Sequence, residues 1–293
     1  MLVSRWSYVD GVRVHALAGG DGPAVVLVHG YGVSGRYLQP LAEALAARCS
    51  VLVVDLPGHG RSGRRRGASG IGELASVLGA WLDAVGLERP VLVASSMGCQ
   101  IATKLAVRRP ERVGPLVLIG PTVDPAKRRA RHQIFGALRD AAHEPALLVA
   151  LAAREGVCRD TRELLAAARS ALADRIEERL PLIEQPSVVI HAGNDGFVSR
   201  AWASEVAELL PQGRLVVVPG EPHAIPFTQP ELVAGIVWDL MEEGDHAARE
   251  LARRLPHGHM PAAQSDDPRP RQRLLPTLGE PPGYEAVVVA PHE

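Results

Sequence analysis

Residues 91–98 read VLVASSMG, an apolar run that leads into two serines, a methionine and a glycine. The run predicts a buried strand, and the residues after the serines predict a helix that begins near Met97. A serine in the sharp turn between them has its hydroxyl lifted above the sheet, beside free N–H groups of the helix. That crowded turn needs small residues two positions to either side, and Ser96 has Ala94 and Gly98 there. Ser95 would have a methionine at plus two, so Ser96 is the candidate nucleophile; the alternative is a serine that only caps the helix.

Similar apolar runs alternate with helical patterns along the rest of the chain. This alternation predicts a mostly parallel sheet that helices cover on both faces. The predicted strands are 25–28, 50–55, 91–94, 115–119, 187–190 and 215–218, preceded by a hairpin of 5–9 and 12–17 that turns at Asp10-Gly11. The predicted helices are 37–47, 72–85, 100–109, 200–210 and 231–241.

The alternation stops between two parts of this predicted core. From about residue 121 to residue 186 the chain is rich in Ala, Arg and Leu and has no strand-like run. An insertion of this length after the sixth strand predicts a helical cap over the ligand-binding edge of the sheet. The predicted division is a core of 1–120 and 184–244, a cap of 121–183 and a proline-rich, disordered tail of 245–293. The last apolar run, 284–290, is expected to dock as a strand or to bind a partner.

Composition excludes several classes of function. The chain has 293 residues, enough for one sizeable core, and 32 basic against 33 acidic side chains give a formal charge of -1. Such a balance predicts no affinity for nucleic acid or an anionic membrane surface. The N-terminus lacks the apolar segment of a secretory signal, and no run is long enough to span a membrane. Three cysteines without close spacing predict no disulfide or metal framework, so we expect a cytoplasmic protein.

A serine hydroxyl is a weak nucleophile without a base, and the base needs a carboxylate to orient it. The candidate acid is Asp195 in VIHAGNDGFV, in a turn just past a predicted strand. The candidate base is His223 in VPGEPH, also just past a strand. Each alone has an ordinary alternative, a turn aspartate and a surface-loop histidine. Together with Ser96 they stand in the order Ser, Asp, His at the carboxyl ends of three strands, which predicts a catalytic triad.

These motifs together resemble the α/β-hydrolase superfamily, over about residues 10–243. The resemblance is carried by VHGYG at 28–32, by DLPGHGRS at 55–62 and by the turn at Ser96. Asp195 followed by Val198, and His223 followed by Pro230, also match the spacing of that superfamily. Departures are alanines at 94 and 192, where glycine is usual. The implied fold is an α/β-hydrolase fold, a mostly parallel doubly wound sheet with a helical cap inserted after strand six.

The resemblance also implies roles for residues around the nucleophile. The backbone N–H groups of Tyr31 and Met97 are expected to form the oxyanion hole, while His29 and His59 are expected to be structural. Asp124 is a rival to Asp195, because some members of the superfamily place the acid there. Cys99, directly after the turn, is expected to pack as a small apolar side chain rather than to act as a thiol. The pair His257 and His259 lacks partners with ligand spacing, so no metal is predicted.

Three functions remain open at this point. The first is hydrolysis of a carboxylic ester, thioester or lactone of a small molecule through an acyl-enzyme, without a cofactor. The second is cleavage of a carbon–carbon bond in a diketone-like substrate, because the same triad supports both reactions. The third is a non-hydrolytic ligand-binding protein, lyase or cyclase. With an ordinary histidine pKa of ~6.5, activity is expected to fall at acidic pH. Substrate identity and the choice between monomer and homodimer are not encoded in any motif.

Overall fold

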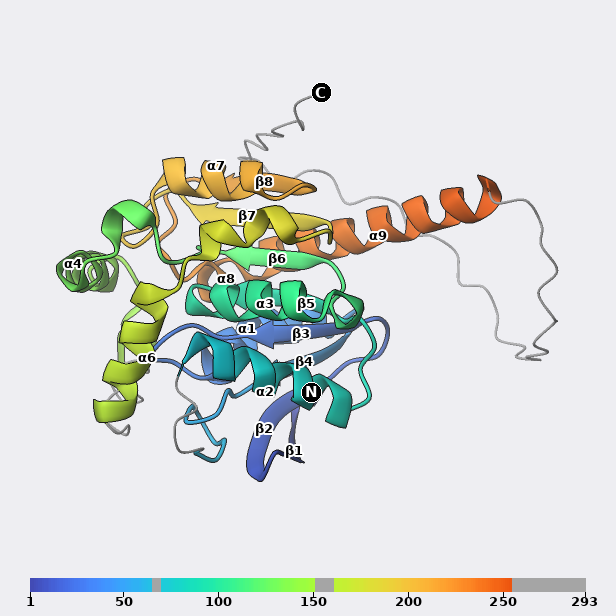
Figure 1. Cartoon of the computed structure of the whole chain (residues 1–293), viewed down its shortest axis with the longest axis horizontal. Coiled ribbons are helices and arrows are strands. Elements are labelled where there is room, and N and C mark those ends of the chain that lie inside the picture. The colour runs from blue at the N-terminus through green and yellow to red at the C-terminus, as the bar shows by residue number, and fades with distance from the viewer. Residues whose placement is uncertain (65–69, 151–160, 255–293) are drawn as a thin grey trace.

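The computed structural model describes residues 1–64, 70–150 and 161–254. It is built around an eight-stranded sheet in the order β1-β2-β4-β3-β5-β6-β7-β8 (Figure 1). The strands are β1 (Val3–Val9), β2 (Val12–Gly19), β3 (Ala24–Val28), β4 (Ser50–Val54), β5 (Val91–Ser95), β6 (Leu116–Ile119), β7 (Ser187–Ala192) and β8 (Gly213–Val218). β2 pairs antiparallel with β1 and with β4, and all other neighbours are parallel. The predicted fold class and strand runs are confirmed.

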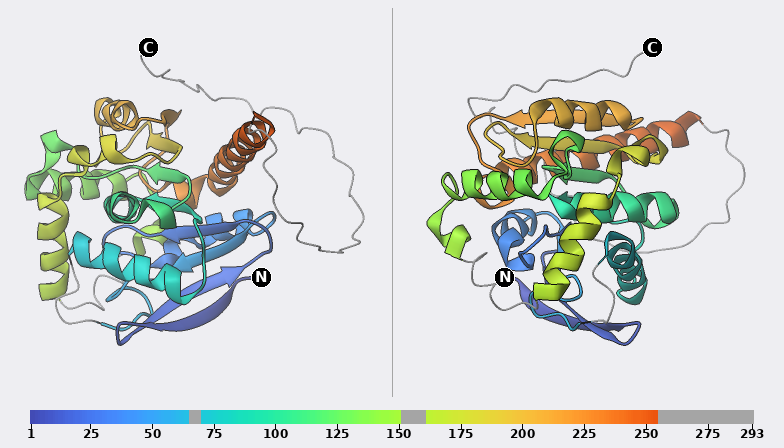
Figure 2. Two further views of the ribbon diagram at one scale, coloured as in Figure 1. Left: turned by 45° about the vertical axis from the view of Figure 1, so that its right-hand side comes forward. Right: turned by 60° about the vertical axis from the view of Figure 1, so that its left-hand side comes forward.

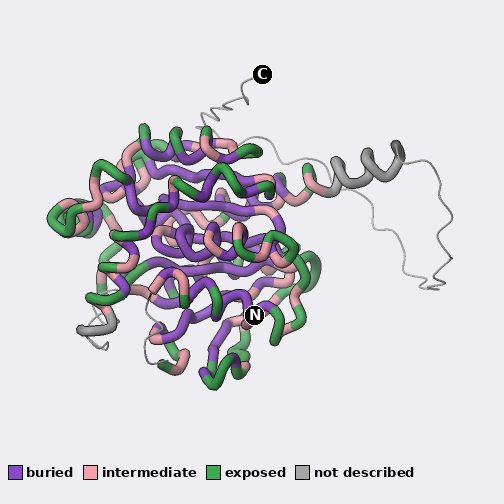
Figure 3. The backbone as a smooth tube through the Cα atoms, viewed as in Figure 1, coloured by how far each residue is buried: buried purple, intermediate pink, exposed green. Residues whose placement is uncertain are grey.

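Helices cover both faces of this sheet because its central strands carry apolar side chains on both sides. In β3, Val26 and Val28 point into one hydrophobic core, whereas Val25 and Leu27 point into the other. The first core lies under α2 (Ile71–Ala84), α3 (Met97–Arg108) and α7 (Arg200–Leu209). The second lies under α1 (Gln39–Leu45), α8 (Ile225–Thr228) and α9 (Pro230–Arg254). Figure 3 shows the strands buried between these two layers.

The inserted segment between β6 and β7 stands at the carboxyl ends of the parallel strands. Its assigned elements, within the described residues, are helical: α4 (Ala130–Ala141), α6 (Thr161–Ala173) and the 3-10 turns Pro125–Lys127, Ile176–Glu178 and Leu180–Leu182. α4 and α6 lie beside this edge of the sheet in both views of Figure 2. The predicted helical cap after strand six is therefore present. Among the described residues, every helix is too short or too polar to cross a bilayer.

Two helix boundaries differ clearly from the sequence prediction, and a third agrees with it. The predicted helix 37–47 divides into a 3-10 turn, Gly35–Leu38, and α1. α1 begins at Gln39, and Pro40 lies in its first turn, where proline is favoured. α3 begins at Met97, as the turn after the serines predicted, and the periodic run 100–109 marks only its later part. α9 continues to Arg254, so the predicted tail of 245–293 begins as helix. Residues 255–293, including the apolar run 284–290, lie outside the described residues.

Candidate active site

Ser96 occupies a strained turn between β5 and α3. Its φ is 56° and its ψ is -120°, a conformation that costs a residue with a Cβ about 1–3 kcal/mol. Ser96 is partly exposed, whereas the residues on both sides are buried. Ser95 is 2% exposed, and its Oγ lies 3.1 Å from the hydroxyl of Tyr37. Of the two serines, only Ser96 is presented at the sheet edge, as the spacing of small residues predicted.

The loop after β3 packs directly on this turn. A Cβ at Gly30 would lie 3.0 Å from the Cβ of Ser96, and a Cβ at Gly98 would lie 2.5 Å from the carbonyl oxygen of Val28. The small residue at position 98 therefore lets α3 start against the end of β3. Because Met97 is the first residue of α3, its N–H has no acceptor within the helix. The loop after β3 thus brings the backbone preceding Tyr31 beside Ser96.

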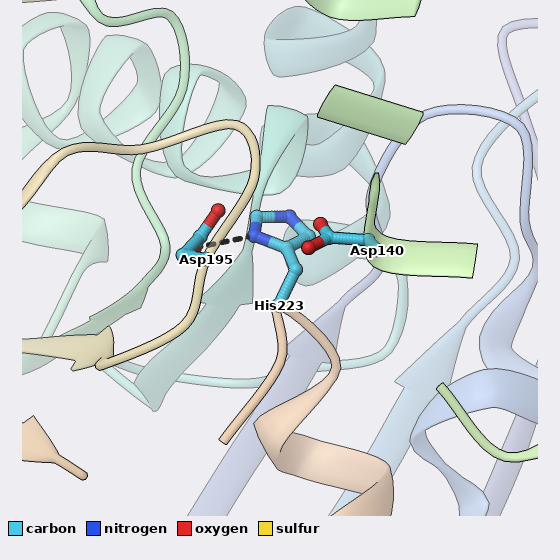
Figure 4. A group of neighbouring side chains, drawn as sticks. All are labelled: Asp140, Asp195 and His223. Atoms are coloured by element: carbon cyan, nitrogen blue, oxygen red, sulfur yellow. Dashed lines mark hydrogen bonds and ion pairs between the residues drawn. The ribbon is translucent and has the colours of Figure 1, made fainter. Parts of the chain in front are cut away.

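The predicted acid and base meet in one short hydrogen bond. His223 Nδ1 lies 2.7 Å from Asp195 Oδ2, and both side chains are buried (Figure 4). The other carboxylate oxygen of Asp195, Oδ1, accepts the N–H groups of Phe197 at 2.7 Å and Val198 at 2.9 Å. These two donors fix the orientation of the carboxylate. The phenyl ring of Phe197 also contacts the imidazole, with the ring centroids 4.8 Å apart.

This pair shifts the pKa values of both groups. Burial alone would raise the pKa of Asp195, but the charge of His223, its hydrogen bond and the two backbone donors hold it below 3.8. Burial alone would lower the pKa of His223, yet the charge and hydrogen bond of Asp195, then the charges of Asp140 and Glu144, raise it from 6.5 to about 9. An ordinary histidine would lose its role as a base only at acidic pH. With the raised pKa of His223, the pH at which activity falls is expected to shift toward alkaline values.

Ser96, after β5, and His223, after β8, lie at the same edge of the sheet, although β6 and β7 separate the two strands. The N–H of Ser96 donates to the carbonyl oxygen of Ile119 at 2.8 Å. The next residue, Gly120, abuts the base so closely that a Cβ there would lie 2.7 Å from Cε1 of His223. His223 Nε2 is buried without a hydrogen-bond partner within residues 1–64, 70–150 and 161–254, and no bond joins it to Ser96 Oγ there. Catalytic hydrogen bonds of this kind are often long in the absence of substrate.

Known proteins share the fold of this chain. The model of the alpha/beta hydrolase family matches residues 25–236 of the chain. The chain belongs to the alpha/beta hydrolase family.

Individual members of this family show how far the likeness extends. The dihydrolipoyllysine-residue acetyltransferase component of the acetoin cleaving system of Cupriavidus necator is 36% identical over 122 residues, 40% of this chain and 32% of that protein. The chain thus spans about a third of the length of this relative. A pimeloyl-(acyl-carrier protein) methyl ester esterase of Nitrosomonas europaea is 26% identical over 74% of this chain and 95% of the relative. The enol-lactonase of Burkholderia xenovorans LB400 shares the fold, with a TM-score of 0.70 at 22% identity over 81% of this chain and 100% of that chain.

In this alpha/beta hydrolase, the motif at 55–62 is structural. Asp55 Oδ1 accepts the N–H of Gly35 at 2.8 Å, and Oδ2 accepts the N–H of Arg61 at 2.9 Å. Asp55 Oδ2 also lies 2.8 Å from His15 Nδ1. Burial opposes ionisation of Asp55, but the bond with His15 and the backbone donors hold its pKa below 3.8. This carboxylate therefore joins β2 and the loops after β3 and β4.

The two histidines of the hydrolase motifs have the contacts of structural residues. His29 is fully buried; its Nδ1 donates to the carbonyl oxygen of Gly30 at 2.8 Å, and its Nε2 accepts the N–H of Leu56 at 3.1 Å. This pair of bonds requires a neutral ring with its proton on Nδ1. The ring of His59 packs on His29 at 4.7 Å, and its Nδ1 donates to the carbonyl oxygen of Pro57. Neither ring contacts Ser96 through a hydrogen bond that the described residues contain.

Two other sequence candidates are accounted for by their neighbours. Asp124, the rival acid, accepts the Ser199 hydroxyl at 2.7 Å and the N–H of Ala126 at 2.9 Å, so it caps a 3-10 turn rather than orienting His223. Cys99 is fully buried, and its thiol donates to the carbonyl oxygen of Ala94. Burial raises the pKa of this thiol, which disfavours a thiolate.

The side chain of Tyr31 has a contact of its own with the inserted segment. Its side chain is 42% exposed, and its hydroxyl donates to the carbonyl oxygen of Leu164 in α6 at 3.0 Å. The loop expected to supply the oxyanion hole is therefore attached to the inserted segment. The prediction that the N–H groups of Tyr31 and Met97 face an oxyanion stays a prediction.

Sequence reasoning missed one group beside the imidazole, the carboxylate of Asp140 in α4. Oxygen atoms of Asp140 and Asp195 and a ring nitrogen of His223 all lie within 4.8 Å of one another (Figure 4). These are ligand types that a metal accepts, but Nδ1 of His223 is already bonded to Asp195. The only signal in the sequence is the spacing Gly136-x-x-x-Asp140, which places both on one face of a helix.

Proposed function

We propose that the chain is a serine hydrolase that cleaves a carboxylic ester, thioester or lactone of a small molecule through an acyl-enzyme. The observation that carries the proposal is the orientation of His223. Asp195 holds Nδ1, so Nε2 is left buried and without a partner among the described residues. The ring abuts Gly120, which follows the residue whose carbonyl oxygen accepts the N–H of Ser96. An imidazole held in this way is suited to take a proton from a neighbouring hydroxyl.

In the proposed reaction, Ser96 Oγ attacks the substrate carbonyl carbon as His223 Nε2 accepts its proton. Asp195 fixes the tautomer and stabilises the imidazolium that forms. The N–H groups of Tyr31 and Met97 receive the negative charge on the substrate oxygen, where one such donor is worth about 3 kcal/mol. His223 then protonates the leaving group, which departs, and activates the water that hydrolyses the acyl-enzyme.

The relatives support the ester-type reaction over the alternatives. The Nitrosomonas protein is named as a methyl ester esterase, and it matches over nearly its whole length. Because the chain spans about a third of its acetyltransferase relative, that protein's reaction is not transferred. The inserted segment is proposed to shape the pocket for a small molecule, since α4 and α6 stand over the sheet edge that carries Ser96.

A fluorophosphonate probe tests the nucleophile. The wild-type protein is expected to be labelled and to hydrolyse short p-nitrophenyl esters, and Ser96→Ala is expected to lose both. Ser95→Ala is the matched control, because its hydroxyl contacts Tyr37 and is only 2% exposed. Labelling that persists in Ser96→Ala would refute the assignment. Faster cleavage of a vinylogous diketone than of any ester would favour the carbon–carbon alternative, and absence of both activities would favour a binding protein.

The assignment of the acid is tested separately. Asp195→Asn is expected to lower kcat/KM by about 10⁴-fold, because the amide favours the wrong tautomer of His223. Asp124→Asn is expected to retain activity within a few fold, since its contacts are those of a cap. A large loss at position 124 with little loss at 195 would reverse the assignment.

A further inference from the structure

A carboxylate of the inserted segment lies beside His223, on the side of the ring away from Asp195 (Figure 4). Asp140, in the last turn of α4, is 2% exposed. Its Oδ1 accepts the N–H of Gly196 at 2.9 Å, and its Oδ2 is buried without a hydrogen-bond partner among the described residues. A buried carboxylate with an unused oxygen is costly unless a positive charge lies close to it. The imidazole of His223 supplies that charge when it is protonated.

α4 is seated directly on the turn 194–196, which carries the catalytic acid. A Cβ at Gly136 would lie 2.9 Å from the carbonyl oxygen of Gly196. The two backbones can approach this closely because position 136 has no side chain. One turn of helix later, Arg139 Nη2 donates to Asn194 Oδ1 at 2.7 Å. With the bond from Asp140 to Gly196, these contacts fix the turn to the inserted segment.

The charged groups around the imidazole come from both the core and the inserted segment. Asp195 and His191 belong to β7 and the turn after it, whereas Asp140 and Glu144 belong to α4 and the residues after it. Burial lowers the pKa of His191, which favours its neutral form. Burial raises the pKa of Asp140, and the charge of His223 opposes that rise. Negative charge therefore faces His223 from two sides.

We propose that Asp140 is a positioning residue for the catalytic base: its carboxylate fixes the turn that carries Asp195 and gives protonated His223 a second negative neighbour. The role of His223 as base rests on the proposed function, but the contact with Asp140 does not. During acylation the imidazolium forms between two carboxylates, so the inserted segment stabilises the charge that develops on the base. Displacing α4 then weakens the base.

The test is the titration of His223 in Asp140→Asn. Asparagine keeps an oxygen that accepts the N–H of Gly196 but removes the charge. NMR of the imidazole, assigned with a His223→Gln variant, is expected to show the midpoint about one pH unit lower than in the wild type. The pH profile of fluorophosphonate labelling is expected to move by the same amount. The matched control is Glu178→Gln, in the same segment but exposed and paired with Arg175, and it should leave both midpoints unchanged.

A second variant guards against a folding defect. Gly136→Ala leaves every charge in place but pushes α4 away from the turn 194–196. The titration midpoint of His223 is therefore expected to fall in this variant too, but by less than in Asp140→Asn. A wild-type midpoint for His223 in either folded variant would overturn the proposal. The proposed function fails in a different way, because a protein that never reacts with the probe can still show the shift by NMR.

Discussion

Replacing Arg179 by methionine tests whether a buried ion pair fastens the inserted segment to the helix that begins after Ser96. Arg179 Nη1 and Nη2 donate to the two carboxylate oxygens of Asp174 at 3.1 and 2.6 Å. Nε donates to Thr103 Oγ1 at 3.0 Å and Nη2 to the carbonyl oxygen of Gln100 at 2.9 Å, both on α3. The side chains of the pair are only 9% and 4% exposed, so water cannot replace these bonds.

The magnitude follows from what methionine leaves behind. It fills much of the volume of the arginine stem but strands a buried carboxylate, and breaking a buried pair in this way costs about 3–5 kcal/mol. Lys104 Nζ still lies 3.0 Å from Asp174 Oδ1, so the expected loss for Arg179→Met is at the lower end, about 3 kcal/mol. Combining it with Asp174→Leu removes the stranded charge. The double variant is therefore expected to be more stable than the sum of the single losses implies.

Urea unfolding followed by circular dichroism measures these differences. The unfolding midpoint of Arg179→Met is expected to fall with an unchanged slope. Glu178→Gln, which removes an exposed pair with Arg175 from the same segment, is expected to change the free energy of unfolding by less than about 0.5 kcal/mol. A wild-type midpoint for Arg179→Met would refute the reasoning. So would a double variant that loses the full sum, because the two side chains would then act independently.

Two further predictions concern the pairs His223–Asp195 and Asp55–His15. The free energy of unfolding is expected to decrease by about 3 kcal/mol as the pH rises from about 6.5 to about 9.5. The protonated ring of His223 stabilises the folded state fully below pH 6.5, and this contribution is lost as the ring deprotonates near pH 9. Urea unfolding across this range checks it, and an identical decrease in His223→Gln would contradict it. Asp55→Ala is expected to cost about 3 kcal/mol in the same assay, since it leaves the buried donors of His15 and Gly35 and the partly buried N–H of Arg61 without this acceptor. A loss below about 1 kcal/mol would mean that the loops hold together without this carboxylate.

The fold was largely predictable because its strands are encoded locally. β5 and its neighbours are short runs of β-branched and aliphatic residues that need cover on both faces, which leaves a parallel sheet with helices as the solution. The hairpin turn at Asp10 and Gly11 was equally local, and both residues have positive φ as a tight hairpin requires. Helix ends were less predictable. α9 continues to Arg254, well past the predicted end at residue 241.

Candidate site residues were predictable where they follow strands and unpredictable where they lie in the inserted segment. Ser96, Asp195 and His223 each come just after a strand, so a parallel sheet brings them to one edge whatever the loops do. Asp140 reaches that edge only because α4 packs on the turn 194–196, and its contact with Gly196 joins residues that are 56 apart in sequence. Helical periodicity says which face of α4 is buried but not what that face meets. The part of the raised pKa of His223 that comes from Asp140 and Glu144 was missed for the same reason.

The attachment points of the inserted segment bear on how it affects catalysis. Asp140 joins it to the turn that carries the proposed acid, Asp195, and Arg179 joins it to α3, whose first residue follows Ser96. Tyr31 joins α6 to the loop beside that serine. A lid fastened only to remote surface would change substrate access and leave the chemistry intact. These three attachments end on the elements that carry the proposed nucleophile, acid and oxyanion donors. Loosening the segment should therefore lower kcat as well as raise KM, and Arg179→Met should do so even where the protein remains folded.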